Sequence, residues 1–269
     1  MADPHADPEA LEALFARFDS AADDSALVLL EELLSRLAAL SGSGDTTLLE
    51  RFPQWLRWQP RLAARYAAYV HDQERGAAYE LLSGAQPGGL SLAQAGGFAQ
   101  RTYARVADMF AQVDFSDCRR FVMVGSGPLP ATLLHVLDRT PVTEAIGLDV
   151  DSEAIGLARQ LARAYAITGL DIQQADGGSY DYAAADVVYI ANLVAPKAAV
   201  LRRVAETARV GTQVVLRDPF ALGCLLAETG LDTLETCYTI AGQGRGDARF
   251  LTRDVFLRLG ASGAGCKVQ

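Results

Sequence analysis

The chain has 269 residues, of which 50% are hydrophobic and 21% charged, a composition typical of a globular protein with a sizeable core. Its 33 acidic and 24 basic side chains give a net charge of -9, which disfavours nucleic acid and anionic membranes as partners. We find neither a membrane-spanning apolar run nor a secretory signal at the start of the chain, so a cytoplasmic protein is expected.

The cysteines are scattered and share no metal-ligand spacing with the three histidines. Unpaired thiols in a reducing compartment are therefore expected, and a bound metal is not. The residues concerned are Cys118, Cys224, Cys237 and Cys266, with His5, His71 and His135.

The first part of the chain has the periodicity of helices. Apolar residues recur at helical spacing behind the capping-type start Asp7-Pro8, and glycine-rich segments at 41–45 and 84–89 predict loops. Residues 47–83 and 91–113 are predicted to be further helical segments. The two apolar stripes are Leu11, Leu14, Phe15 and Phe18, and then Leu27, Leu30, Leu33, Leu34 and Leu37.

From Arg120 onward, short apolar runs alternate with helical stretches, as in a parallel sheet with crossover helices. The predicted strands are 121–124, 145–148, 171–174, 187–190 and 213–216, and the predicted helices are 129–138, 152–166 and 197–208. Residues 234–240 and 255–259 are expected to be edge strands, in an antiparallel arrangement. The predicted fold class is therefore α/β, with an all-helical domain over residues 1–115 and a Rossmann-like domain over residues 116–269.

Two glycines follow the first predicted strand, where a ligand can approach the backbone closely before a helix begins. Asp149 ends the next strand at the spacing of a carboxylate that accepts ribose hydroxyls. A tight turn without a ligand is the alternative, but the pair together favours a ligand that contains a nucleoside. The turn residues expected to contact it are Gly125, Ser126, Gly127 and Pro128.

The prolines of this turn select among nucleoside ligands. Pro130 stands where the third glycine of a dinucleotide fingerprint would be, and Pro128 and Pro130 each remove a backbone donor that a pyrophosphate needs. S-adenosylmethionine contains ribose and adenine but no phosphate. It therefore fits this turn better than NAD or FAD does.

Two later strand ends are expected at the same cleft. Asp176-Gly177 follows the third strand, where an acid can accept the exocyclic amine of adenine, although an Asp-Gly turn needs no ligand. Asn192-Leu193 follows the fourth strand and is expected to line the cleft, although asparagine at a strand end is also a common cap.

The string Gly-Ser-Gly-Pro-Leu-Pro at 125–130 resembles the signature of nicotianamine synthases. The resemblance continues in order through Leu-Asp-Val-Asp at 148–151, Ile-Ala-Asn-Leu-Val at 190–194 and Val-Leu-Arg at 215–217. It covers about a hundred residues, and the N-terminal helical half also suits the family. Asp-Pro-Phe at 218–220 departs from the plant enzymes, so the chain looks more like the bacterial branch of opine-type metallophore synthesis.

The resemblance implies a reaction. The 3-amino-3-carboxypropyl group of S-adenosylmethionine, the co-substrate, would be transferred to the α-amine of histidine, releasing methylthioadenosine, with no metal in the enzyme. L-histidine is the expected enantiomer, and an opine dehydrogenase would act on the product. A homodimer is a further guess.

The resemblance also implies site residues. Glu80 resembles the glutamate that the family supplies from its helical domain, with Glu74 as the rival alignment, and Tyr103 resembles a family tyrosine. These two are expected to accept a proton from the substrate amine and to orient it. Arg217 is expected to hold a substrate carboxylate, although a structural salt bridge is an equal alternative.

Three alternatives remain open from the sequence. The first is an S-adenosylmethionine-dependent methyltransferase on the same fold. The second is a true nicotianamine synthase that repeats the transfer, and the third is a nucleoside-sensing module without catalysis.

Overall fold

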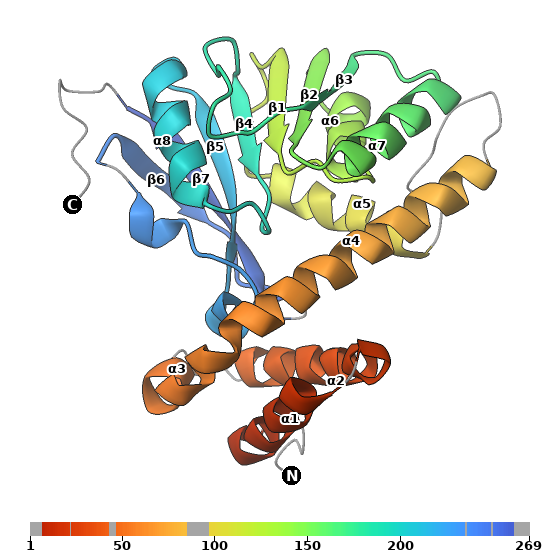
Figure 1. Ribbon diagram of the computed structural model, residues 1–269. Coiled ribbons are helices and arrows are strands. Elements are labelled where there is room, and N and C mark those ends of the chain that lie inside the picture. The colour runs from red at the N-terminus through yellow and green to blue at the C-terminus, as the bar shows by residue number, and fades with distance from the viewer. Residues whose placement is uncertain are drawn as a thin grey trace.

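The computed structural model describes residues 7–21, 23–42, 47–84, 97–234, 236–248 and 250–260. A layer of N-terminal helices lies against one end of a twisted sheet that has helices on both faces, and the long helix α4 runs between the two parts (Figure 1). No helix within these ranges combines the length and apolar character needed to cross a membrane.

The N-terminal layer forms where the leucine stripes predict it. It consists of α1 (Pro8–Ser20), α2 (Asp23–Gly42), α3 (Leu48–Arg51) and the 3-10 helix η1 (Pro53–Trp58). The Asp7 side chain accepts a hydrogen bond from the Glu9 amide and caps α1, as its sequence suggests. Phe15 is fully buried and stacks on Trp58 with ring centroids 4.3 Å apart, so the tryptophans of η1 belong to the helical core.

Helix α4 (Gln59–Ser83) joins the two parts of the molecule. Its first turns contribute Leu62 to the helical core, whereas Ala77 and Ala78 pack with side chains of the sheet domain. Arg75 also forms an ion pair of 2.8 Å with Glu153 at the start of α7. Helix α5 (Gly97–Phe110) then packs on the sheet itself.

The sheet has seven strands in the order β3-β2-β1-β4-β5-β7-β6. The first five are parallel and the last two are antiparallel, as predicted. The order reverses direction between β1 and β4, and such a switch point leaves a crevice at the carboxyl ends of the strands. The bounds are β1 Arg120–Val124, β2 Glu144–Asp149, β3 Leu170–Gln174, β4 Val187–Ile190, β5 Gln213–Pro219, β6 Tyr238–Gln243 and β7 Thr252–Leu259.

The two faces of the sheet carry separate cores because side chains alternate along each strand. Phe121 and Met123 of β1 face α5, α6 and α7, whereas Val122 and Val124 face the core that α8 covers. The crossover helices are α6 (Ala131–Arg139), α7 (Ser152–Ala164) and α8 (Lys197–Thr207), and all three lie within two residues of their predicted ends.

One strand prediction was partly wrong. Residues 234–240 were expected to form one strand, but β6 begins at Tyr238 and the 3-10 helix η3 (Leu231–Thr233) precedes it. Just before η3, the amide of Gly230 and the hydroxyl of Thr229 both donate to Asp218, at 2.6 and 2.8 Å, and hold the chain in a turn. The amide of Leu234 then donates to the carbonyl of Leu231 at 3.3 Å and closes η3, so the first residue of the predicted strand is bonded to the 3-10 helix instead.

The two predicted domains share side chains across their boundary. Val106 and Phe110 of α5 lie in a core of the sheet, and Leu225 and Leu251 lie in the helical core. Leu225 belongs to the 3-10 helix η2 (Ala221–Leu225), which follows β5. The helical layer is therefore fixed to the sheet by packing. The same packing fixes the walls of a cavity between the two.

Leu225 tests this coupling. It is fully buried between α2, α4 and η1, so Leu225→Ala is expected to lower the free energy of unfolding by about 2 to 5 kcal/mol. Leu27→Ala, on a side chain of α2 that is 50% exposed, is expected to change it by no more than about 0.5 kcal/mol. Urea denaturation measures both, and equal effects would contradict the shared core.

Candidate active site

The glycine turn after β1 is held in a conformation that favours glycine. Gly125 and Gly127 have φ angles of +76° and +62°, in the left-handed region. The amides of Gly125 and Ser126 donate to the carbonyl of Leu148, at 2.9 and 3.0 Å, which fastens the turn to β2. A Cβ on Gly125 would also lie 2.7 Å from Val194, so a side chain there would collide with the loop after β4.

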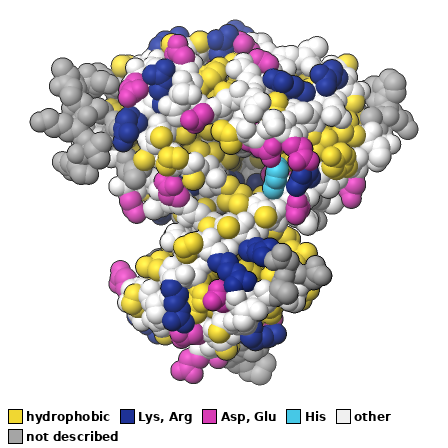
Figure 2. All heavy atoms as spheres, viewed as in Figure 1, with side chains coloured by type: hydrophobic (Ala, Val, Ile, Leu, Met, Phe, Trp, Pro, Cys, Tyr) yellow, Lys and Arg dark blue, Asp and Glu magenta, His cyan; other side chains and the backbone are white. Residues whose placement is uncertain are grey.

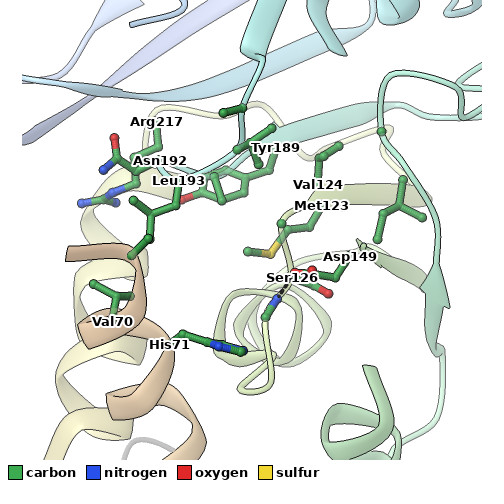
Figure 3. A pocket seen from close by; sticks show the side chains of 18 of the residues that line it. Val70, His71, Met123, Val124, Ser126, Asp149, Tyr189, Asn192, Leu193 and Arg217 are labelled. Carbon is green, nitrogen blue, oxygen red and sulfur yellow. Dashed lines mark hydrogen bonds between the residues drawn. The ribbon is translucent and has the colours of Figure 1, made fainter. Parts of the chain in front are cut away.

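Asp149 lies directly beside this turn, as its position at the end of β2 predicts. One carboxylate oxygen accepts a hydrogen bond from the backbone amide of Gly127 at 2.9 Å, and the other accepts one from the backbone amide of Asp151 at 3.0 Å. Figure 3 shows Asp149 beside Ser126 of the turn. A carboxylate has about four acceptor sites, so Asp149 retains capacity for the hydroxyls of a ligand.

A cavity of about 650 Å³ opens at the switch point, between α4, α5 and the carboxyl ends of the strands. Figure 2 shows a hollow between the helical layer and the sheet domain, with charged side chains at its rim. The volume is within the range of small-molecule sites. All the residues predicted to contact the nucleoside except Pro128 line it: Gly125, Ser126, Gly127, Asp149, Asp176, Gly177, Asn192 and Leu193.

Two of these residues have polar atoms that no described residue satisfies. The hydroxyl oxygen of Ser126 and the amide oxygen of Asn192 are both buried and without a hydrogen-bond partner among the described residues. Buried polar atoms are normally paired, so these two are candidates for contact with a ligand.

Asp176 and Gly177 form the turn that the sequence suggested. Asp176 accepts from the amide of Gly178 at 2.8 Å, and the carbonyl of Gly177 accepts from the Tyr182 hydroxyl at 2.8 Å. The turn is therefore explained by local bonds, although both residues face the cavity.

The structure places Glu74, and not Glu80, in the cavity. Glu80 is on the exposed side of α4 and does not line the cavity. The carboxyl of Glu74 lies against the glycine turn, since a Cβ on Gly127 would come within 2.5 Å of its Oε2 atom. Glu74 and Glu80 are six residues apart, which puts them on different faces of one helix.

The environment of Glu74 favours its neutral form. Desolvation raises its pKa to about 8, and the negative charge of Asp149 adds to this, whereas Arg105 acts in the opposite direction. A group with such a pKa exchanges a proton easily near neutral pH, as a general base must.

Tyr103 also lies outside the cavity. Its hydroxyl donates to Asp138 at 2.6 Å, and its ring packs edge-on against His135 with centroids 4.7 Å apart. The resemblance therefore misplaces the tyrosine, because Tyr103 faces α6. The side chains of α5 that face the cavity are Thr102 and Arg105, and Tyr66 of α4 supplies a phenol there.

Arg217 lines the cavity at the end of β5 and also forms bonds within the protein. It donates to the Thr252 hydroxyl at 2.7 Å and forms an ion pair of 3.4 Å with Asp254. Figure 3 shows Arg217 grouped with Tyr189 and Asn192, away from Ser126 and His71. The salt-bridge interpretation is therefore present in the structure, with Asp254 as the partner, and the expected contact with a substrate carboxylate stays a prediction for a side chain that lines the cavity.

Sequence reasoning missed Phe250 and Thr252, which line the cavity, and Lys197, which bonds to the loop after β4. Phe250 and Thr252 reach the cavity only through the long-range pairing of β7 with β5. Lys197 at the start of α8 is fully buried and donates to the carbonyls of Asn192, at 2.7 Å, and of Glu228. It thereby fixes the loop after β4, a role that no sequence motif indicates.

Cys118, Cys224 and Cys237 form no disulfide with one another, whereas Cys266 and His5 lie outside the described residues. Among the residues described, no three histidine, cysteine or acidic side chains gather as a metal site would require. The Nε2 atom of His71 instead lies 3.2 Å from a carboxylate oxygen of Asp151, and both residues line the cavity.

Comparison with known proteins finds similar folds but no similar sequence. No protein-family model matches the chain, and no curated protein matches it. The structure is similar to that of a glutamate-to-glutamine variant of MtNAS, a nicotianamine synthase-like protein, in complex with S-adenosylmethionine. The TM-score is 0.77 at 16% identity, over 94% of this chain and 98% of that one.

A second structure of MtNAS, in complex with MTA and tNA, has a TM-score of 0.74 at 18% identity, over 93% of this chain and 97% of that one. The predicted fold class is confirmed, including its N-terminal helical part, because the likeness covers nearly the whole chain. At these identities the likeness shows the fold alone.

The raised pKa of Glu74 gives a testable dependence of stability on pH. Its pKa is about 8 in the folded protein against 4.5 as its ordinary value, so between these limits the folded state holds a proton that the unfolded state has lost. Stability attributable to Glu74 therefore falls as pH rises, by up to about 1.4 kcal/mol per pH unit.

Glu74→Gln removes this titration. We expect the stability of the variant relative to the unsubstituted protein to increase steadily from pH 5 to pH 8, measured by urea denaturation. Parallel stability curves for the two proteins would show that the carboxyl titrates normally.

Proposed function

We propose that the protein transfers the 3-amino-3-carboxypropyl group of S-adenosylmethionine to the α-amine of histidine and releases methylthioadenosine. The observation that carries this proposal is the placement of Glu74, a desolvated carboxyl, against the glycine turn of the Rossmann-like domain. The likeness in fold to MtNAS, a structure of which contains S-adenosylmethionine, supports it.

The cavity fits S-adenosylmethionine as the co-substrate. Asp149 provides acceptor capacity for ribose, and Asp176 lines the cavity where an adenine amine can be bound. Pro128 and Pro130 leave the turn poor in the donors that a phosphate needs. The unpaired oxygens of Ser126 and Asn192 can accept from the amino group of the methionine part.

The proposed chemistry is a single displacement at carbon. The lone pair of the neutral amine forms a bond to Cγ of the aminocarboxypropyl group as the bond from Cγ to sulfur breaks, and sulfur keeps that electron pair as the thioether of methylthioadenosine. The amine then loses a proton to the carboxylate of Glu74. A base with a pKa of about 8 is matched to an α-amine, whose pKa is also about 8.

The choice of Cγ over the methyl group depends on position. A sulfonium activates all three attached carbons, so the product is set by which carbon lies in line with the incoming amine. Glu74 on α4 places the proton acceptor on the helical side of the cavity, and the amine must approach from that side. Arg217 holds a substrate carboxylate in this proposal, which fixes the acceptor from the opposite wall.

The wider role proposed is a step in opine-type metallophore synthesis, with an opine dehydrogenase acting next and the metal belonging to the product. The net charge of -9 supports small-molecule partners over nucleic acid or membrane. Cytoplasmic location, a homodimer and the L enantiomer of histidine are part of the same proposal.

Mass spectrometry of the reaction tests the proposal directly. Purified protein incubated with S-adenosylmethionine is expected to form methylthioadenosine only when histidine is added, with histidine gaining one aminocarboxypropyl group. The two enantiomers are tested separately. Formation of S-adenosylhomocysteine would instead show a methyltransferase, and repeated additions would show a nicotianamine synthase of the plant kind.

Two glutamates of α4 provide a matched pair for catalysis. Glu74→Gln is expected to lower kcat by roughly 100-fold or more while S-adenosylmethionine still binds, because the amine loses its proton acceptor. Glu80→Gln makes the same change on the exposed face of the helix and is expected to leave kcat unaltered. Single-turnover assays and calorimetry measure the two effects, and the reverse pattern would make Glu80 the base.

A further inference from the structure

Arg105 is a cavity residue with an unsatisfied side chain. It lies on α5 and lines the cavity, and its buried Nε atom has no hydrogen-bond partner among the described residues. No ion pair within the described ranges includes it. Its guanidinium lies 4.9 Å from the ring centroid of Phe250, which also lines the cavity.

The charges around Arg105 do not neutralise it. Arg217 adds a second positive charge, and the carboxylate of Asp254 is already paired with Arg217. The remaining neighbours are the phenols of Tyr66 and Tyr189, which burial keeps protonated by raising their pKa. Glu74 acts on the same region, but its pKa of about 8 leaves it largely neutral at pH 7.

A half-buried cation with a buried, unpaired Nε is costly, and arginine does not escape the cost by losing its proton. Burial lowers the pKa of Arg105, and Arg217 lowers it further, yet a guanidinium remains charged at any physiological pH. Charges removed from water in proteins are normally paired, and strongly perturbed charged groups cluster at functional sites. The group that pairs with Arg105 must be an anion that reaches the helical side of the cavity.

We propose that Arg105 binds a carboxylate of a substrate in this cavity. The inference rests on the proposed function, because both substrates of that reaction carry a carboxylate. A planar guanidinium is suited to a carboxylate in a two-point contact. A phosphate is disfavoured by the acids Glu74 and Asp149 in the same cavity.

Two substrates can supply the carboxylate, and paired probes distinguish them. Histidine is compared with histidinamide in the presence of methylthioadenosine, and S-adenosylmethionine is compared with its decarboxylated form. Isothermal calorimetry measures each affinity without turnover. The unsubstituted protein is expected to prefer the probe with a carboxylate by roughly tenfold to hundredfold in at least one pair.

Arg105→Met is expected to abolish that preference while methylthioadenosine, which has no carboxylate, binds as before. Loss of the preference in the histidine pair assigns Arg105 to the acceptor, and loss in the S-adenosylmethionine pair assigns it to the co-substrate. Arg253→Met is the matched control, because the Nε of Arg253 is equally buried and unpaired but lies outside the cavity.

The stability of the ligand-free variant gives an independent readout. Removing a half-buried charge that has no ion-pair partner is expected to leave the Tm of Arg105→Met unchanged or raised, as for residues kept for binding. Preferences that persist in the variant, or a lowered Tm with unchanged preferences, would overturn the proposal. Failure of the proposed function would give a different result, because the unsubstituted protein would then form no methylthioadenosine when histidine is added.

Discussion

The packing of α4 across the carboxyl edge of the sheet is the constraint on which the site depends. This helix contributes Leu62 to the helical core and Ala78 to the sheet domain, so its middle turns are held over the switch point. The carboxyl of Glu74 then lies against Gly127, which has no side chain and a φ of +62°. Burial in this position raises the pKa of Glu74, so the chemistry of the residue follows from the docking of the helix.

The cavity has two ends with different electrostatic character. The acidic end contains Asp149 and Asp176, whose oxygens accept hydrogen bonds from nearby backbone amides. The basic end contains Arg105 and Arg217, with phenols around them. Under the proposed function, the hydroxyl-rich part of the ligand lies at the acidic end and its anionic part at the basic end, since either part placed at the wrong end would lose its partners.

Sequence patterns predict the strands and the turn of this site better than they predict which side chains line the cavity. The strands and the glycine turn follow from apolar runs and from the need for positive φ, both of which are local properties. The choice between Glu74 and Glu80 is not local, because it depends on which face of α4 meets the sheet. Likewise Tyr103 and Arg105 are two residues apart on α5 and face different ways, and only Arg105 meets the cavity. Thr252 enters through antiparallel pairing with β5, which the sequence predicts in outline but not in register.

Under the proposed function, the raised pKa of Glu74 couples catalysis to binding. In the free cavity the carboxyl is largely neutral at pH 7, and a neutral carboxyl is a poor base. A sulfonium brought near it favours the ionised form, because an opposite charge lowers the pKa of a carboxyl. A carboxylate bound by Arg105 acts in the opposite direction, by neutralising the cation that otherwise stabilises the ionised Glu74. The balance of these two charges sets the protonation of Glu74 in the loaded site, so the acceptor amine meets a competent base only when the sulfonium is present.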